Sequence, residues 1–263
     1  MSMIIIPIQI FTIMVASWVA AGLINYLADV LPVSRKLVRP SCKNCSLSLN
    51  LIYYIAWPIK CSNCGKKVDF RHWIVRFGFM LLVLFIWLYS SSIALHFIPA
   101  FFVLMYFMLV SVIDYEHRII MHPTSVLGAV LGVLVGFNLH GFTSTVTGGI
   151  VGFFGMLILY LFGSVFVSWL TRRRQKEMGE EALGFGDVIL GGVLGLFIGM
   201  PGTIISLMLA IFSAGAVSII YLLVALLKRE NSSNLTIPYG PFLIFGAFTI
   251  LFLKNNLLLV MGW

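Results

Sequence analysis

Two aspartates stand beside strongly apolar stretches of this sequence, where carboxylates are unusual. Asp187 ends the run Gly184-Phe185-Gly186-Asp187, and Asp114 follows the apolar residues 97–113. Ionisable side chains at membrane depth are costly, and they usually mark a functional site. Two carboxylates held close together share one proton, so one can deprotonate a water while the other polarises a peptide carbonyl. The pair is therefore a candidate aspartic-protease dyad, and the two glycines of the run would let the backbone approach a substrate strand.

Four cysteines form a second candidate site. Cys42, Cys45, Cys61 and Cys64 follow the pattern C-x2-C-x15-C-x2-C. Two such Cys-x-x-Cys knuckles can surround one tetrahedral Zn2+ and leave no position open for water, which is typical of a structural metal. Metal binding would supply folding free energy to a loop too small for a core of its own. Two disulfides are the alternative interpretation.

The composition places both candidate sites in a membrane protein. Hydrophobic residues make up 60% of the 263 residues, only 10% are charged, and the mean hydropathy is +1.06. Soluble domains are about a quarter charged. Residues 1–10 contain no Lys or Arg, unlike the basic start of a secretory signal peptide, so the first apolar segment is expected to be retained as a span.

A span needs about 20 apolar residues, and this length gives eight candidates. Their approximate ranges are 4–29, 74–92, 97–113, 124–139, 145–170, 188–200, 203–227 and 240–262. The sixth is short, and its glycines at 191, 192, 195 and 199 predict close helix packing. Met200-Pro201-Gly202 predicts a tight turn before the seventh.

The fold class expected is an all-α membrane protein of about eight transmembrane helices with a small zinc-ribbon-like loop domain. The predicted domains are a first transmembrane helix at 1–31, a tetracysteine loop at 32–73 and a polytopic helical domain with seven spans at 74–263.

The basic residues predict the orientation of these spans. Every Lys and Arg except Lys254 falls at connections that eight spans place on one side. That side should be cytoplasmic, with both termini outside. Asp114 and Asp187 then share the cytoplasmic rim, and the tetracysteine loop lies in a reducing compartment, which favours zinc over disulfides.

The formal net charge of +8 is explained by this orientation. A nucleic-acid partner is not expected, because a recognition motif with interleaved aromatic residues in a soluble domain is absent from the sequence. The expected surroundings are a lipid bilayer and a substrate helix lying in it.

Five motifs follow one another along the chain in an order typical of one known family. They are Asn25 with Leu31-Pro32, the four cysteines, Asp114, Gly184-Phe185-Gly186-Asp187-Val188, and Ile237-Pro238-Tyr239-Gly240-Pro241-Phe242. In this order they resemble the type IV prepilin peptidases, the GxGD class of membrane aspartic proteases. The resemblance extends over nearly the whole chain.

This resemblance implies an activity. The enzyme would cut the short basic leader from prepilins or pseudopilins at the cytoplasmic face of the bacterial inner membrane, with Asp114 and Asp187 as catalytic residues. Bacterial members also methylate the new N-terminus with S-adenosylmethionine. The chain departs from the family pattern at Gly22, Val30, Arg76 and Met121-His122-Pro123. Most of these departures lie in the region linked to methylation.

Two other functions remain open from the residues alone. A proton- or cation-coupled transporter could use the same two aspartates, although transporter sites usually lie near the membrane midplane rather than at its rim. A zinc-stapled scaffold would explain the cysteines but not the Gly-x-Gly-Asp run.

Overall fold

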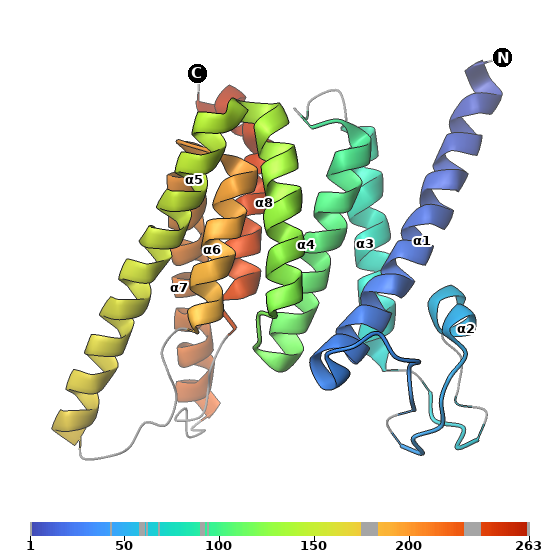
Figure 1. The fold of residues 1–263 in the computed structure, drawn as a ribbon, viewed down its shortest axis with the longest axis horizontal. Helices are drawn as coiled ribbons and strands as arrows, with labels where there is room; N and C mark the ends of the chain where they lie inside the picture. Colours follow the sequence, from blue (N-terminus) through green and yellow to red (C-terminus); the bar gives the residue numbers. More distant parts are fainter. Residues whose placement is uncertain are drawn as a thin grey trace. The chain divides into compact units, whose positions relative to one another are not determined.

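A computed structural model gives the fold (Figure 1). It describes residues 2–42, 44–57, 61, 63–67, 69–89, 93, 95–174, 184–228 and 238–261. The chain divides into two compact units, Met1–Ile113 and Asp114–Trp263.

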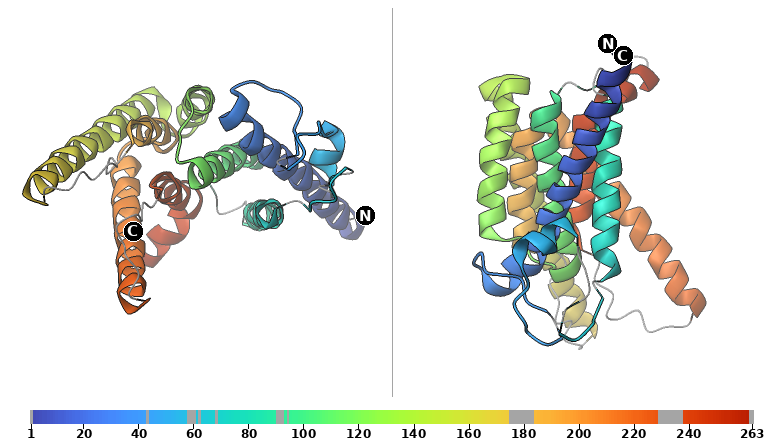
Figure 2. Two further views of the ribbon diagram at one scale, coloured as in Figure 1. Left: turned by 90° about the horizontal axis from the view of Figure 1, so that it is seen from below. Right: turned by 90° about the vertical axis from the view of Figure 1, so that its right-hand side faces the viewer.

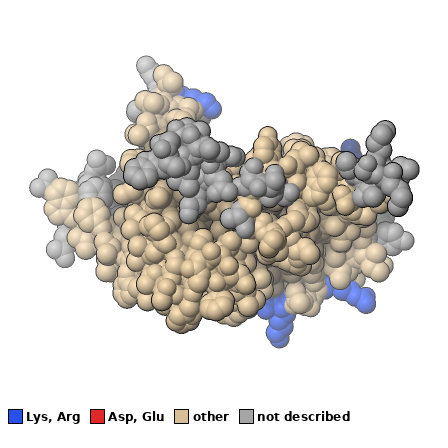
Figure 3. Space-filling view, turned by 90° about the horizontal axis from the view of Figure 1, so that it is seen from above, with Lys and Arg blue, Asp and Glu red and all other residues tan. Residues whose placement is uncertain are grey.

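The described residues are mostly helical, which confirms the expected all-α class. The β-type pairing among them is one isolated bridge between Ser41 and Ser48. Five helices are long and apolar enough to cross a membrane, and two shorter apolar helices accompany them. One of the five, at His122–Val165, covers the fourth predicted span and most of the fifth. The chain is therefore a multi-pass membrane protein. Among the described residues, the face drawn in Figure 3 shows mostly uncharged surface, with a few Lys and Arg side chains at its margin.

Unit 1 is built on α1 (Ser2–Ser34), α2 (Leu51–Ala56), α3 (Phe70–Leu88) and most of α4 (Phe97–His117). Helix α1 packs against both α2 and α3. A side chain at Gly22 of α1 would collide with the backbone carbonyl of Ile55 in α2. The short helix between the two cysteine pairs is thus held directly against α1.

Unit 2 begins at the last turn of α4 and contains α5 (His122–Arg174), α6 (Phe185–Ile198), α7 (Gly202–Lys228) and α8 (Gly240–Met261). Helix α5 is interrupted at Gly141, whose φ of 77° and ψ of 172° are not helical. A positive φ is readily adopted by glycine alone. The break at Gly141 therefore separates the fourth and fifth predicted spans.

Helices α5 and α6 lie side by side in the views of Figure 2. Glycines make this contact close: a Cβ atom at Gly152 would collide with the carbonyl of Gly191, and one at Gly195 with the carbonyl of Gly148. The prediction of close packing by the sixth span is confirmed. Because α6 begins with the Gly-x-Gly-Asp run, this packing fixes one of the candidate site residues.

The remaining helices of unit 2 complete its bundle. Residues 199–201 form the predicted turn between α6 and α7, and α8 packs against both α6 and α7. Many large apolar side chains of α7 are exposed, including Phe212, Ile219 and Leu223. Such a surface is suited to contact with lipid.

Candidate functional site

Asp114 lies in the last turn of α4. This helix continues past its predicted end at 113 to His117, so the carboxylate belongs to the helix and not to the loop after it. Arg118 ends the helix: its φ is 54°, and its backbone N–H donates to the carbonyl of Asp114 at 2.8 Å. Asp114 is thereby held on a rigid element with only 4% of its surface exposed.

Asp187 lies in the first turn of α6. Its carboxylate Oδ2 accepts the backbone N–H of Gly184 at 3.2 Å, and its own N–H donates to the carbonyl of Gly184 at 3.0 Å. The N-terminus of a helix favours negative charge, because its first N–H groups lack partners within the helix. The Gly-x-Gly-Asp run therefore builds a local anion site for the carboxylate that it carries.

A second helix N-terminus serves Asp114. The backbone N–H of Gly240, the first residue of α8, donates to Asp114 Oδ2 at 3.0 Å. A Cβ atom at position 240 would lie 2.5 Å from the same oxygen. Glycine is needed here for steric reasons.

The two aspartates predicted to share a membrane rim are brought together within unit 2. Asp187 is 8% exposed, and the charge of Asp114 acts on it directly. Gly186 helps to hold the arrangement, since a Cβ atom there would approach the Cβ of Ile120 to 2.9 Å. The result is a pair of buried carboxylates, each of which accepts a backbone N–H at a helix N-terminus. Such a pair can hold and transfer one proton.

The sequence did not indicate the contact made by Gly240 or the position of its neighbour Tyr239. Tyr239 is half-buried, and burial together with the charge of Asp187 raises its pKa to about 12. The segment from Pro238 to Phe242 belongs to a motif noted in the sequence, but nothing there linked it to Asp114. Ile237, the first residue of that motif, lies outside the described residues.

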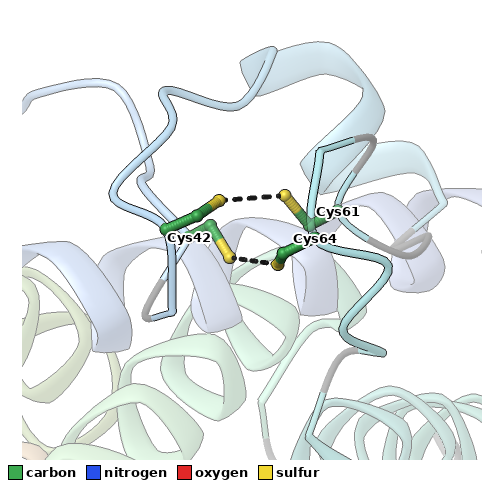
Figure 4. A group of neighbouring side chains, drawn as sticks. Cys42, Cys61 and Cys64 are labelled. Carbon is green, nitrogen blue, oxygen red and sulfur yellow. Dashed lines mark hydrogen bonds between the residues drawn. The ribbon is translucent and has the colours of Figure 1, made fainter.

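The four cysteines meet as predicted. Their Sγ atoms all lie within 4.8 Å of one another, and all four are free thiols. The two pairs face each other across 3.6 Å between Cys42 and Cys64 and 3.5 Å between Cys45 and Cys61 (Figure 4). Four sulfurs around a tetrahedral Zn2+ would be about 3.8 Å apart, given Zn–S bonds of about 2.3 Å. The cluster therefore fits one metal ion.

The backbone of each knuckle prepares its first thiol for a metal. The N–H groups of Asn44 and Cys45 lower the pKa of the Cys42 thiol to about 6. The N–H groups of Cys64 and Asn63 likewise lower the pKa of the Cys61 thiol. The thiolate is the form that binds metal, so both effects favour ligation.

Unit 1 also contains a polar network that the sequence analysis did not single out. Asp29 of α1 accepts hydrogen bonds from Tyr54 and, at 2.8 Å, from Arg71 Nη2, and it pairs with His72 Nε2 at 3.2 Å. The charges at Asp29 and Arg71 lie in or beside apolar segments, which is the signal that could have revealed them. The network joins α1, α2 and α3.

Arg76 fastens the same three helices. It is 0% exposed, and its guanidinium donates to backbone carbonyls at the end of α2, at 2.7 Å to Ile55 and 3.2 Å to Tyr54. The guanidinium carbon also lies 4.7 Å from the ring centroid of Trp18. A cation at a helix C-terminus satisfies carbonyls that lack partners within the helix.

This arrangement bears on S-adenosylmethionine. Its sulfonium cation would be attracted by an aromatic face or by a carboxylate. In unit 1 the face of Trp18 already holds Arg76, and Asp29 is already paired with Arg71 and His72. These groups do not fit the cofactor as they stand, and we assign it no step.

Comparisons with known proteins find a family that is similar to part of this chain. Residues 100–220 match the type IV leader peptidase family. This range includes Asp114 and the Gly-x-Gly-Asp run, and it confirms the resemblance seen in the sequence. No solved structure matches the chain.

Curated relatives agree with the family match. Proteins named prepilin leader peptidase/N-methyltransferase are 28% identical in Pseudomonas putida, 25% in Myxococcus xanthus and 29% in Pseudomonas aeruginosa. The alignments cover 74%, 76% and 74% of this chain. They cover only 63%, 59% and 63% of the respective relatives, so the chain spans less than two thirds of their length.

Proposed function

We propose that this chain is a membrane-embedded aspartic endopeptidase that removes the basic leader of type IV prepilins or pseudopilins. Asp114 and Asp187 are its catalytic dyad. The observation that carries the proposal is the pair of buried carboxylates, each held by a backbone N–H at a helix N-terminus. The match to the type IV leader peptidase family over residues 100–220 supports the same assignment.

The geometry suggests how the dyad would act. Backbone N–H groups hold Oδ2 of each aspartate, from Gly240 in one case and Gly184 in the other. The Oδ1 atoms remain for catalysis: in the proposed mechanism one contacts the attacking water and the other contacts the oxygen of the scissile carbonyl. The ionised aspartate takes a proton from the water as it attacks the carbonyl carbon, and the protonated one donates to the carbonyl oxygen. Proton transfer to the departing amine then breaks the C–N bond and restores the dyad.

The chemistry requires no metal at the dyad. We assign the tetracysteine cluster a structural Zn2+ that orders the loop domain at 32–73, beside a first span at 1–31 and a helical peptidase domain at 74–263. The basic connections favour a cytoplasmic position for this loop and for the dyad. A substrate helix lying in the bilayer would present its leader at that rim.

Mass spectrometry of a co-expressed prepilin tests the proposal. Wild type, Asp114→Asn and Asp187→Asn are compared, since asparagine keeps the size of the side chain but cannot exchange the proton. We expect the leader mass to be lost with wild type alone, and both variants to keep the thermal stability of wild type. Intact prepilin with folded wild type would reject the peptidase. A proton or cation flux that needs the same aspartates would then favour a transporter.

The same spectra test methylation, which the printed names of the relatives attribute to those proteins. A mature pilin carrying the added mass of one methyl group at its N-terminus would assign this second reaction to the chain. A cleaved pilin with a free amine would limit the chain to cleavage.

A further inference from the structure

The connection between the two cysteine pairs contains an apolar run that takes no part in the metal cluster. Residues 51–59 read Leu-Ile-Tyr-Tyr-Ile-Ala-Trp-Pro-Ile and carry no charge, and the first six of them form helix α2. Such a run is too short to cross a bilayer, which takes about 20 apolar residues. A short apolar helix of this kind belongs either to a protein core or to a segment that dips into the membrane and returns.

The end of α2 lies beside the interior of two helices that are long and apolar enough to span a membrane. The indole Nε1 of Trp18 in α1 donates to the carbonyl of Ala56 at 2.7 Å, and Trp18 lies near the middle of the candidate span Pro7–Ser34. Arg76 Nη2 donates to the carbonyl of Ile55 at 2.7 Å. Arg76 is six residues, or about 9 Å, from the start of α3. The last turn of α2 therefore lies farther in than the ends of both spans.

The carbonyls at the end of α2 are bound by side chains of these two spans. The last carbonyls of a helix have no partner within it and are often bound by water. No water is available within the hydrocarbon of a bilayer, so backbone groups there have to be bound by protein. Arg76 Nη2 also donates to the carbonyl of Tyr54 at 3.2 Å, and the carbonyls of residues 54–56 thus all receive a donor from α1 or α3. This is the pattern expected of a helix that ends where water is excluded.

The outer face of α2 is apolar and continues the exposed surfaces of α1 and α3. Ile52 and Trp57 are 74% and 55% exposed. The ring of Trp57 stacks on that of Trp18 at 5.5 Å and meets the ring of Trp73 edge-on at 5.9 Å. Trp73 in turn stacks on Phe77 of α3. Neighbouring residues of the two spans are exposed and apolar as well: Val15, Val19 and Ile74. A face that continues two membrane spans is covered by the same lipid that covers them, and a soluble partner has no access at that depth.

We propose that α2 is a re-entrant helix, which enters the bilayer from the side of the cysteine loop and places Ile52 and Trp57 against lipid acyl chains. The partner of this surface is the hydrocarbon of the membrane. Because the two cysteine knuckles flank α2 in the chain, the inserted helix holds the metal cluster at the membrane surface. The inference concerns unit 1 alone and does not depend on the proposed peptidase function.

Photocrosslinking to lipid tests this placement. The benzophenone amino acid p-benzoyl-phenylalanine is incorporated at position 57 of the full chain, and the purified protein is reconstituted into dioleoyl-phosphatidylcholine vesicles and irradiated. The lipid esters are then hydrolysed with alkali. Mass spectrometry of the peptide around position 57 should find the added mass of one oleic acid. A crosslink to the headgroup would leave glycerophosphocholine instead.

Two further positions calibrate the result. Leu81 is exposed on α3 inside its candidate span, so the same side chain at position 81 should also carry oleic acid. Leu37 is exposed too, but it lies in the connection between α1 and α2, and position 37 should carry none. Position 52 is the second site on α2, used if the substitution at 57 lowers the thermal midpoint. Oleic acid is expected there as well.

Each outcome bears on the proposal. Oleic acid on α2 and at position 81, but not at position 37, supports the insertion. Glycerophosphocholine alone on α2 would place the helix on the surface of the bilayer and overturn the insertion. Oleic acid at position 37 as well would overturn an insertion that is specific to α2. A crosslinked second copy of the chain, or no adduct on α2 while position 81 is labelled, would overturn lipid as the partner.

Discussion

Gly240 and Asp114, which are 126 positions apart in the sequence, are joined by a hydrogen bond of 3.0 Å from the backbone N–H of one to the carboxylate Oδ2 of the other. The bond is buried and leaves no space for a side chain at position 240. It ties the N-terminus of α8 to the end of α4 and complements the bond between Gly184 and Asp187 at the N-terminus of α6. Each aspartate of the proposed dyad is thus oriented by a glycine N–H.

Gly240→Ala should damage cleavage more than stability. The added Cβ would lie 2.5 Å from Asp114 Oδ2, so either the carboxylate or the start of α8 must move. Overpacking of this kind costs about 1–3 kcal/mol. A misplaced catalytic group costs about 100-fold in rate. We expect kcat for prepilin cleavage to fall by that order, with a smaller change in the thermal midpoint.

Gly215→Ala is the control for that experiment. A Cβ atom there meets no atom within 4 Å, and the residue lies inside α7. Alanine should be neutral or slightly stabilising, because it is a better helix former than glycine by about 1 kcal/mol. Equal loss of activity in both variants would show that the contact with Asp114 is unimportant.

The sequence predicted those features that depend on local chemistry. Hydropathy predicted the long apolar helices, and the two C-x2-C pairs predicted a cluster of four thiols. The positions of Lys and Arg between the predicted spans put Asp114 and Asp187 at the same membrane rim. The bond from Gly240 to Asp114 could not be predicted, because every residue except proline offers a backbone N–H. Whether the N–H of Gly240 reaches Asp114 depends on where α8 begins in the folded protein.

The fold of α5 and the position of Arg76 illustrate the same limit. Two predicted spans with a short connection became one helical element broken at Gly141, since a single non-helical residue suffices there. From the sequence, Arg76 was one of the basic residues near the first loop and a departure from the family pattern. Only the tertiary structure shows that its guanidinium donates hydrogen bonds to the carbonyls of Tyr54 and Ile55 in α2.

Removal of one cysteine should empty the metal centre. Cys61→Ser replaces a buried ligand whose thiol pKa is lowered by the N–H groups of Cys64 and Asn63. Native mass spectrometry of the purified chain should find one Zn2+ in wild type and none in the variant, whose loop should be cut faster by protease. Structural zinc contributes about 10–16 kcal/mol of binding free energy that drives folding.

Lys66→Gln is the matched control for the metal centre. Lys66 is exposed in the same loop. Its backbone carbonyl accepts the N–H of Cys61, and glutamine keeps that carbonyl, so the zinc content should not change. Wild-type protein that carries no zinc after growth with added metal, and two disulfides instead, would contradict the assignment.

Arg76→Gln should loosen α2 from the rest of unit 1. The guanidinium is fully buried and binds the carbonyls of Ile55 and Tyr54 at 2.7 and 3.2 Å. Glutamine is too short to reach them, and buried carbonyls without donors cost about 1–3 kcal/mol each. We therefore expect the free energy of unfolding to fall by about 2–4 kcal/mol, measured by denaturant titration in detergent.

Because α2 lies between the two cysteine knuckles, zinc should also be lost to a chelator more quickly. Arg39→Gln, at an exposed arginine between α1 and α2, should leave both quantities unchanged. If the two variants unfold alike, the carbonyls at the end of α2 are satisfied without Arg76, and the metal loop folds independently of α3.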